Sequence, residues 1–434
     1  MRNTKIVLNL TFLSLTLTAC QPRQSPQQLA QSQNVFQQNT RFRSAARAQK
    51  MNVYVGNLHS HTSYSDGILT PREAYRMAEG NGLDFMAVTE HNHSSAGGSD
   101  GIHLTDELYE DLKAAAKAAT RKGKFAALYG QEVSTISSGN HVNIFEASEI
   151  VRVRHGDFKT LYEKWLPAHP EVPFMQFNHP NVARDLGLED SHFASQNSMQ
   201  AEDERVEEAM HTHAFEANSS KQFNDYGYDD YGRDFKKLAR AANPYVKTIE
   251  ILNGPGTRPR PLPKVDAYHE KDYLFYLNQG FQLAPVADQD NHHAHWGSLS
   301  PARTGVLAPE LTKAAIYEGL RSRRVFATED KNLFITLQAD NAWMGEEISA
   351  RSTTLKVQVT DADEPQGALQ VQIFADKVGG SVARPVHQAQ VKPGQTVTFQ
   401  WEGLSSGMYA FAKVTQFNSS GSQDEAWTAP VFIK

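Results

Sequence analysis

One stretch of the sequence, NLHSHTSYSDG at residues 57–67, brings together side chains that suit a metal site. The apolar run before it, 53–58, predicts a strand that ends at His59 and His61. Residues two apart on an extended chain point to the same face, so the strand aims both imidazoles at one point. A turn at Gly67 then brings Asp66 back toward them. Two histidines and a carboxylate at one point favour a transition metal, although a His-x-His pair alone is more often a solvated strand end.

Strand-like and helix-like segments alternate after this stretch. The apolar strand-like runs are 52–58, 83–89, 124–129, 141–145, 173–178, 246–252 and 282–287. Thr70 and Glu73 predict a capping box at the start of one helix, and the Ala- and Lys-rich segment 106–121 predicts another. This alternation favours an α/β domain with a largely parallel sheet or barrel, whose active face lies at the carboxyl ends of its strands.

Candidate metal ligands recur at or next to these strand ends. They are six histidines and three acids: His59, His61, Asp66, His91, Glu132, His141, His179, Asp290 and His292. Each has an ordinary alternative when taken singly, because Glu132 could serve as a helix cap and His179 as a turn residue. The whole set is hard to reach by chance, and it exceeds the ligands that one ion needs. We therefore expect two or three divalent ions, with zinc, manganese and iron all open.

The order of these motifs resembles the PHP (polymerase and histidinol phosphatase) metal-dependent hydrolases. The resemblance runs from about residue 53 to 327 and rests on HSH at 59–61, SDG at 65–67, TEHN at 89–92, then Glu132, His141, His179 and DNH at 290–292. The segment 323–333 resembles secreted PHP hydrolases of the carbaryl-hydrolase-like subgroup, which also carry a C-terminal β module. The resemblance implies a distorted seven-stranded β/α barrel with a di- or trinuclear site.

The resemblance also implies which residues share an ion. One ion would take His59, His61, Glu132 and Asp290; a second would share Glu132 and add His141 and His179; a third would take Asp66, His91 and His292. Two positions depart from the family pattern. Glu90 stands where the family usually has Asp, which puts the orientation of His91 in question, and Asp66 stands where some relatives have His.

The activity implied is hydrolysis by a metal-bridging hydroxide, with Glu132 and Asp290 in catalytic positions. Small phosphoesters are the first expected substrates, and carboxyl or carbamate esters are the alternative. His93, His293 and His295 are candidates for protonating the leaving group, while Arg258 and Arg303 are candidates for binding an anionic substrate. A different class remains open, namely a surface binding protein with structural metals and a glycan-binding β module.

The N-terminus predicts an exported lipoprotein. Arg2 and Lys5 precede an apolar run, 6–17, that is shorter than the ~20 residues needed to span a bilayer. The only cysteine of the chain, Cys20, follows in LTAC at 17–20, where a lipobox requires it. We expect acylation of Cys20 and attachment at the periplasmic side, to the outer membrane if the source is Gram-negative; an ordinary cleaved signal or a signal anchor is the alternative.

Composition sets the remaining expectations for the 434 residues. We expect a signal at 1–20, a flexible polar tether at 21–50, a metallohydrolase domain at 51–348 and a β-sandwich-like module at 349–434, where apolar residues alternate with period two. The polar segment 191–233 predicts a long excursion over the active face that could act as a lid. With a net charge of −6 and a pI near 6.3, the chain has no basic field for nucleic acid.

Overall fold

The computed structural model describes residues 51–92, 104–137, 140–153, 157–180, 234–254, 256–380, 383–417 and 423–434, with the backbone alone described at 134–137 and 140. The predicted signal, tether and 191–233 excursion, together with His93, lie outside these ranges. No helix among the described residues is long and apolar enough to cross a membrane.

Each of the seven predicted runs overlaps a strand. They are β1 (Asn52–Asn57), β2 (Phe85–His91), β3 (Ala126–Ser137), β4 (Asn140–Phe145), β5 (Met175–Phe177), β6 (Val246–Asn253) and β8 (Ala284–Ala287). Three further strands, β7 (Ala267–Tyr268), β9 (Arg303–Ala308) and β10 (Val325–Thr328), extend the sheet. The strand order is β10-β9-β1-β2-β3-β4-β5-β6, with β7 and β8 both paired to β6.

The sheet is mixed rather than uniformly parallel. The pairs β1–β2, β2–β3, β5–β6 and β6–β8 are parallel, but β4 runs antiparallel to both β3 and β5. Because only residues 138 and 139 separate β3 from β4, this connection forms a hairpin, which requires antiparallel strands.

The two ends of the sheet, at β8 and β9, approach each other through a side chain. Thr304 Oγ1 in β9 accepts from the Ala287 amide of β8 at 3.0 Å and donates to the Ala287 carbonyl at 3.1 Å. Among the strands that the structure describes, no strand pairing joins β8 to β9 or β10. The closed seven-stranded barrel therefore stays an expectation, and an α/β domain built on a large mixed sheet is what the structure shows.

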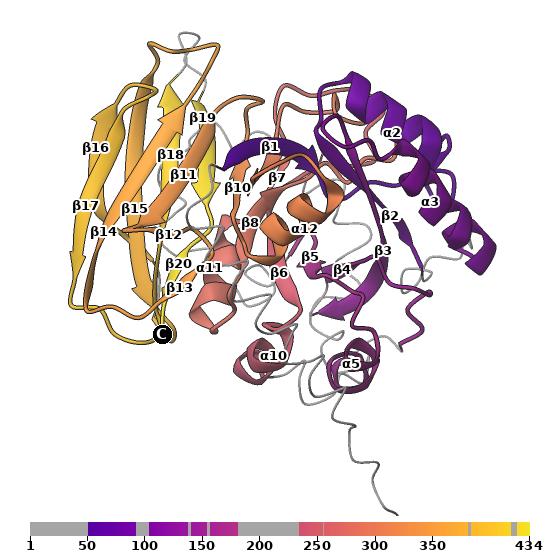
Figure 1. Ribbon diagram of the computed structural model, residues 1–434, viewed down its shortest axis with the longest axis horizontal. Coiled ribbons are helices and arrows are strands. Elements are labelled where there is room, and N and C mark those ends of the chain that lie inside the picture. The colour runs from indigo at the N-terminus through magenta and orange to yellow at the C-terminus, as the bar shows by residue number, and fades with distance from the viewer. Residues whose placement is uncertain are drawn as a thin grey trace, which may run out of the picture. The chain divides into compact units, whose positions relative to one another are not determined.

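The two helices that the sequence predicts are present. α2 (Pro71–Gly80) begins with the predicted capping box at Thr70, and α3 (Asp106–Ala119) follows Thr105, whose side chain accepts from the Leu108 amide. Figure 1 shows α2 and α3 next to each other beside β2 and β3. The remaining helices are α4 (Phe158–Thr160), the π-helix η1 (Leu161–Trp165), α5 (Leu166–Ala168), α10 (Phe235–Ala242), α11 (Glu270–Asn278) and α12 (Lys313–Arg321).

The C-terminal part is built of strands. They are β11 (Phe334–Ala339), β12 (Ala342–Trp343), β13 (Glu347–Ile348), β14 (Ser352–Thr360), β15 (Ala368–Lys377), β16 (Arg384–Val391), β17 (Thr396–Glu402), β18 (Met408–Phe417), β19 (Gln423–Thr428) and β20 (Val431–Ile433). One sheet has the order β12-β11-β14-β17, and its apolar residues share one buried cluster with those of β15 and β18. The smaller sheet begins at Phe334, before the predicted boundary at 349, because β11 pairs along its whole length with β14.

The C-terminal strands also continue the sheet of the first part. β10 pairs antiparallel with β19, with Phe326 opposite Thr428, and Figure 1 shows the two strands adjacent. A shared apolar cluster supports this junction, since the ring of Tyr273 in α11 lies 5.9 Å from that of Phe411 in β18. The described residues of the first part and of the C-terminal strands therefore pack against each other.

Candidate metal centre

The floor of the candidate site is formed by His59, His61 and Glu132, whose side chains are fully buried. The Nε2 atom of His59 lies 3.1 Å from that of His61 and 3.1 Å from Glu132 Oε1. Both Nε2 atoms lie 3.1 Å from Asp290 Oδ1, and His61 Nε2 lies 3.3 Å from Glu132 Oε2. Four donors placed tetrahedrally at zinc bond lengths would be about 3.3 Å apart. The spacing of these four side chains is thus close to that of a single tetrahedral site.

Glu132 also reaches a second group. Its Oε1 atom lies 3.0 Å from His141 Nδ1 and 3.2 Å from His179 Nε2. The amide of Asn178 donates to the same oxygen at 2.9 Å and holds the carboxylate in place. Glu132 comes from β3, and His141 comes from the antiparallel β4, so the β3–β4 hairpin sets their separation.

A third group surrounds Asp66. Its Oδ1 atom lies 3.3 Å from His292 Nε2 and 3.8 Å from His61 Nδ1, and its Oδ2 atom lies 3.5 Å from His91 Nε2. His91 in addition places Nδ1 3.0 Å from Glu132 Oε2. All nine predicted ligands therefore converge, but His91 faces two groups, whereas the resemblance implies that it serves only one.

Three buried atoms at this centre have no hydrogen-bond partner. They are His91 Nδ1, Glu132 Oε2 and His141 Nδ1. The two histidine atoms lie 3.0 Å from Glu132 without the alignment of a hydrogen bond. A buried polar atom left unpaired costs about 1–3 kcal/mol, so a shared partner such as a cation would satisfy all three. Imidazole nitrogens with carboxylate oxygens suit zinc, manganese or iron, and the cluster can hold divalent metal.

The acids and the histidines of the centre stabilise each other's charged forms. Burial opposes ionisation of Glu132, but His59, His141 and His91 hold the pKa of its carboxyl well below the usual value. Burial likewise disfavours a charged His59, yet Asp290, Glu132 and Glu250 raise the pKa of its imidazole well above the usual value. Because a ligating imidazole must be neutral, metal binding to this centre releases protons.

Some side chains of the centre are fully buried, and others are partly exposed. The side chains of His59, His61 and Glu132 have no exposed surface, whereas that of Asp66 is 47% exposed and that of His179 is 23% exposed. His91, His141 and Asp290 are exposed to a similar, intermediate degree as His179. Among the described residues of the centre, solvent or a substrate can therefore reach these partly exposed side chains, but not His59, His61 or Glu132.

Two ligands adopt left-handed backbone conformations. His179 has φ 26° and Asp290 has φ 48°, a region that L-residues other than glycine seldom occupy. Each such residue costs of order 1–3 kcal/mol and persists only when its surroundings fix it. The left-handed conformations of His179 and Asp290 thus lower the stability of the fold, and they direct both side chains into the centre.

A buried acid that the sequence reasoning did not select supports the floor. Glu250 in β6 places Oε1 2.8 Å from His59 Nδ1. An acid within the strand-like run 246–252 was the available signal, although Lys247 and Thr248 in the same run make it a weak one. The Glu90 carboxylate accepts from the amide of Thr62 at 3.0 Å and from the hydroxyls of Thr62 and Ser65. It therefore holds the loop after β1 rather than His91.

The residues predicted to bind an anion or to donate a proton contact other groups of the protein. Arg303 is buried, and its guanidinium donates to the carbonyl oxygens of Gly297, Ser300 and Ala302, which corrects its predicted role in binding substrate. These bonds hold the loop between β8 and β9 instead. Arg258 is paired with Asp266 at 2.8 Å. The Nε2 atoms of His293 and His295 lie at hydrogen-bond distance from the carbonyl oxygens of Thr257 and Pro259.

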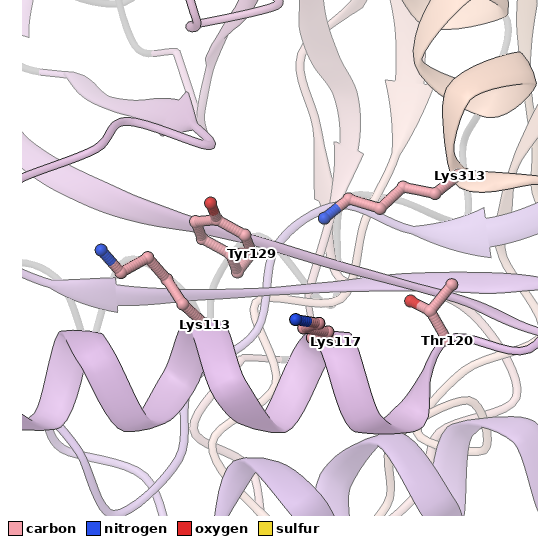
Figure 2. A pocket seen from close by; sticks show the side chains of 5 residues that line it. All are labelled: Lys113, Lys117, Thr120, Tyr129 and Lys313. Atoms are coloured by element: carbon pink, nitrogen blue, oxygen red, sulfur yellow. The ribbon is translucent and has the colours of Figure 1, made fainter.

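A cavity of about 340 Å³ lies elsewhere, between α3 and α12. Figure 2 shows its lining residues, Lys113, Lys117, Thr120, Tyr129 and Lys313. Two of its lysines already have carboxylate partners, because Lys113 pairs with Glu110 and Lys313 with Glu146. None of the nine ligands lines this cavity, so it is separate from the metal centre.

Comparisons with known proteins give distant likenesses only. No family model matches the chain, and no curated protein matches it. A two-domain protein of Bacteroides vulgatus, containing a predicted PHP-like metal-dependent phosphoesterase, is 15% identical with a TM-score of 0.43 and covers 85% of this chain and 91% of its own.

Two further solved structures are similar over part of the chain. A protein of Bifidobacterium adolescentis, assigned as a metal-dependent phosphoesterase, is 13% identical with a TM-score of 0.26 and covers 61% of this chain and 94% of its own. An amidohydrolase of Chromobacterium violaceum is 14% identical with a TM-score of 0.24 and covers 55% of this chain and 87% of its own. At such identities and TM-scores, these likenesses establish neither the family nor the activity of this chain.

Proposed function

We propose that this chain is a metal-dependent hydrolase that acts on small ester substrates, with phosphoesters as its first substrates. The observation that carries this proposal is the open cluster of nine ligands arranged around Glu132. Structural zinc sites are closed by four protein ligands, whereas catalytic sites keep a side open to substrate. The exposed rim of His179 and Asp66 supports the enzyme over a binding protein with structural metals.

The buried and the exposed residues of the centre would have different roles. Divalent ions bound there would supply Lewis-acid activation of water and of the ester. Glu132 would contribute its two carboxylate oxygens to adjacent groups of ligands. Asp290 would complete the buried group with His59 and His61. The buried floor excludes solvent from below, which strengthens every charge interaction at the open side.

Phosphoesters come first because the ordered motifs resemble PHP hydrolases. Carboxyl or carbamate esters are the second candidate, on the resemblance of residues 323–333 to the carbaryl-hydrolase-like subgroup. The contacts of that segment favour a supporting role, since Arg323 donates to the Gly345 carbonyl and Glu329 accepts from the Glu425 amide. Through these hydrogen bonds, the segment 323–333 is connected to the C-terminal part of the chain.

A substrate panel tests the proposal. Purified protein is stripped with a chelator, reloaded separately with zinc, manganese or iron(II), and assayed on chromogenic phosphomonoesters, phosphodiesters and carboxylesters. We expect metal-dependent turnover of a phosphoester that falls at least about 100-fold in Glu132→Ala, because a buried ligand is lost. Turnover of carboxylesters alone would support the second candidate. A folded protein that binds metal and turns over no ester would overturn the enzyme proposal.

We also propose that lipidated Cys20 holds the protein at a membrane surface, with 21–50 as a flexible tether. The lipobox at 17–20 supports this proposal. Cys20→Ala is expected to move the protein from the membrane fraction to the soluble fraction, because the acyl chains can no longer be attached. Fractionation with detection of the chain measures this, and unchanged partitioning of the variant would contradict it.

A further inference from the structure

Glu250 lies behind the metal centre and contacts two of its ligands. It is fully buried in β6, and its Oε1 atom lies 2.8 Å from His59 Nδ1. Its Oε2 atom accepts from the backbone amide of His179 and, at 2.6 Å, from the side-chain amide of Asn253. Two of these groups are amide donors, and the third is an imidazole nitrogen that can donate.

The bond to His59 decides which nitrogen of this imidazole faces the metal centre. An ionised carboxylate can only accept, so His59 Nδ1 must carry a proton. In the neutral imidazole this leaves the lone pair on Nε2, which is the atom that faces Asp290 and Glu132. Glu250 therefore fixes the tautomer in which His59 can bind an ion.

The bond to His179 fixes the backbone. The φ of His179 is 26°, which is unfavourable for a residue with a Cβ, and its amide is anchored on Glu250. This conformation brings His179 Nε2 within 3.2 Å of Glu132 Oε1. One buried carboxylate thus orients the side chain of one ligand and the backbone of another.

We propose that Glu250 is a positioning residue that couples His59 to His179, so that both ligands are set for metal by a single carboxylate. The proposal rests on the metal centre of the proposed hydrolase, but it concerns metal binding rather than turnover. Glu90 provides no substitute, since its bonds go to Thr62 and Ser65. Loss of Glu250 is expected to weaken the groups that contain His59 and His179 together.

Glu250→Gln gives a sharp test because glutamine cannot satisfy all three contacts. If the amide oxygen faces His59, the amide NH₂ points at two other N–H donors, those of His179 and Asn253. If the side chain is flipped, its NH₂ donates to His59 Nδ1 and moves the proton to Nε2, which then cannot bind metal. Removing such a support typically weakens metal binding 10–100-fold.

Asp84→Asn is a matched control. Asp84 precedes β2, and its carboxylate also accepts a backbone amide, that of Val55 at 2.8 Å, without contacting a ligand. Metal affinity is measured for the full chain by competition with a chromophoric zinc chelator, with circular dichroism as the check on folding. We expect Glu250→Gln to bind zinc 10–100-fold more weakly and Asp84→Asn to stay within about 2-fold of wild type.

The outcomes separate this inference from the proposed function. If the wild type binds none of zinc, manganese and iron(II), the proposed hydrolase fails. If the wild type binds zinc and folded Glu250→Gln binds it equally well, the positioning role is overturned. Should the variant not fold, long-range ¹⁵N–¹H correlation spectra of the zinc-loaded wild type decide the matter: ligation of His59 through Nε2 with a proton on Nδ1 supports the role, and ligation through Nδ1 refutes it.

Discussion

Glu132 occupies the junction of the centre. Its Oε1 atom lies within 3.2 Å of nitrogens from His59, His141 and His179, and its Oε2 atom lies within 3.3 Å of nitrogens from His61 and His91. No other ligand is shared so widely among the described residues. A change at Glu132 therefore acts on more than one candidate ion.

Metal stoichiometry tests this sharing. Glu132→Ala is expected to lose more than one ion per chain, because it removes a ligand and the negative charge between neighbouring cations. His91→Ala is expected to keep more metal than Glu132→Ala and to leave a slow enzyme, because the group of His59, His61 and Asp290 does not include His91. Elemental analysis of metal-replete protein measures both.

His169→Ala is the control for these variants, since His169 pairs with Glu171 outside the centre. Its metal content is expected to equal that of the wild type. A Glu132→Ala variant with wild-type metal content would contradict the central place of this residue. A wild type with no more than one ion would rule out the multinuclear arrangement.

The sequence sufficed to name nine residues that the structure brings together, because spacing after strands places side chains at one edge of a sheet. Their role as metal ligands stays a prediction. It could not reveal Glu250, whose role depends on which residue lies across the sheet. It also misjudged Arg303, because a sequence does not show that three carbonyl oxygens surround a buried guanidinium.

At the scale of elements, the loop from β1 to α2 depends on a close backbone approach. A Cβ added to Gly67 would lie 2.7 Å from the carbonyl carbon of His61 and 2.8 Å from the amide nitrogen of Thr62. These are backbone atoms, so relief requires a shift of the segment that carries His61 and Asp66.

We expect Gly67→Ala to weaken zinc binding and lower the Tm. Gly80→Ala is its control, because nothing lies within 4 Å of a Cβ at this last residue of α2, and alanine favours the helix by about 0.5–1 kcal/mol. Chelator competition and thermal unfolding measure both variants. Equal zinc affinity of the two would show that the loop tolerates the extra atom.

The elements were predicted well where periodicity is strong and less well where direction depends on connections. All seven strand runs and the cap at Thr70 are present. The reversed direction of β4 follows from its short connection to β3, since Ser137 pairs with Asn140. The boundary at 349 stays a prediction; β11, which lies before it, alternates in burial and pairs with β14 of the smaller sheet.

At the scale of the whole molecule, Glu329 lies buried where the first part meets β19. Burial raises the pKa of its carboxyl to about 7; Glu425 and Asp424 act in the same direction, while Lys264 and the Tyr268 hydroxyl oppose them. Between its ordinary pKa of 4.5 and about 7, the folded chain binds more protons than the unfolded chain. Stability contributed by this group therefore falls as pH rises through that window.

Glu329→Gln removes this titration. We expect the Tm of the wild type to fall more than that of the variant between about pH 5 and about pH 8. Parallel pH profiles of the two Tm values would show that Glu329 does not carry the effect.

The C-terminal strands contribute no described ligand, yet they are expected to be needed for stability. β19 covers the edge of β10, and the Tyr409 hydroxyl donates to the Asn278 side chain of α11 at 2.6 Å. A chain ended at Ser349 would expose that edge and the cluster around Phe411. We expect it to aggregate or to unfold at lower temperature, while any folded fraction keeps its metal. A truncated chain with the Tm of the full chain would contradict this.

The pairing of β1 with β9 has a consequence for when metal can enter. Asn52 lies opposite Ala308, so the strand that leads to His59 gains one of its two neighbours only after about 250 further residues exist. Asp290 and His292 also come late in the chain. The full set of candidate ligands can then assemble only after most of the chain has been made. If the chain crosses a membrane unfolded, as its N-terminus predicts, the ions it holds are those of the compartment where folding ends, whatever the cytosol contains.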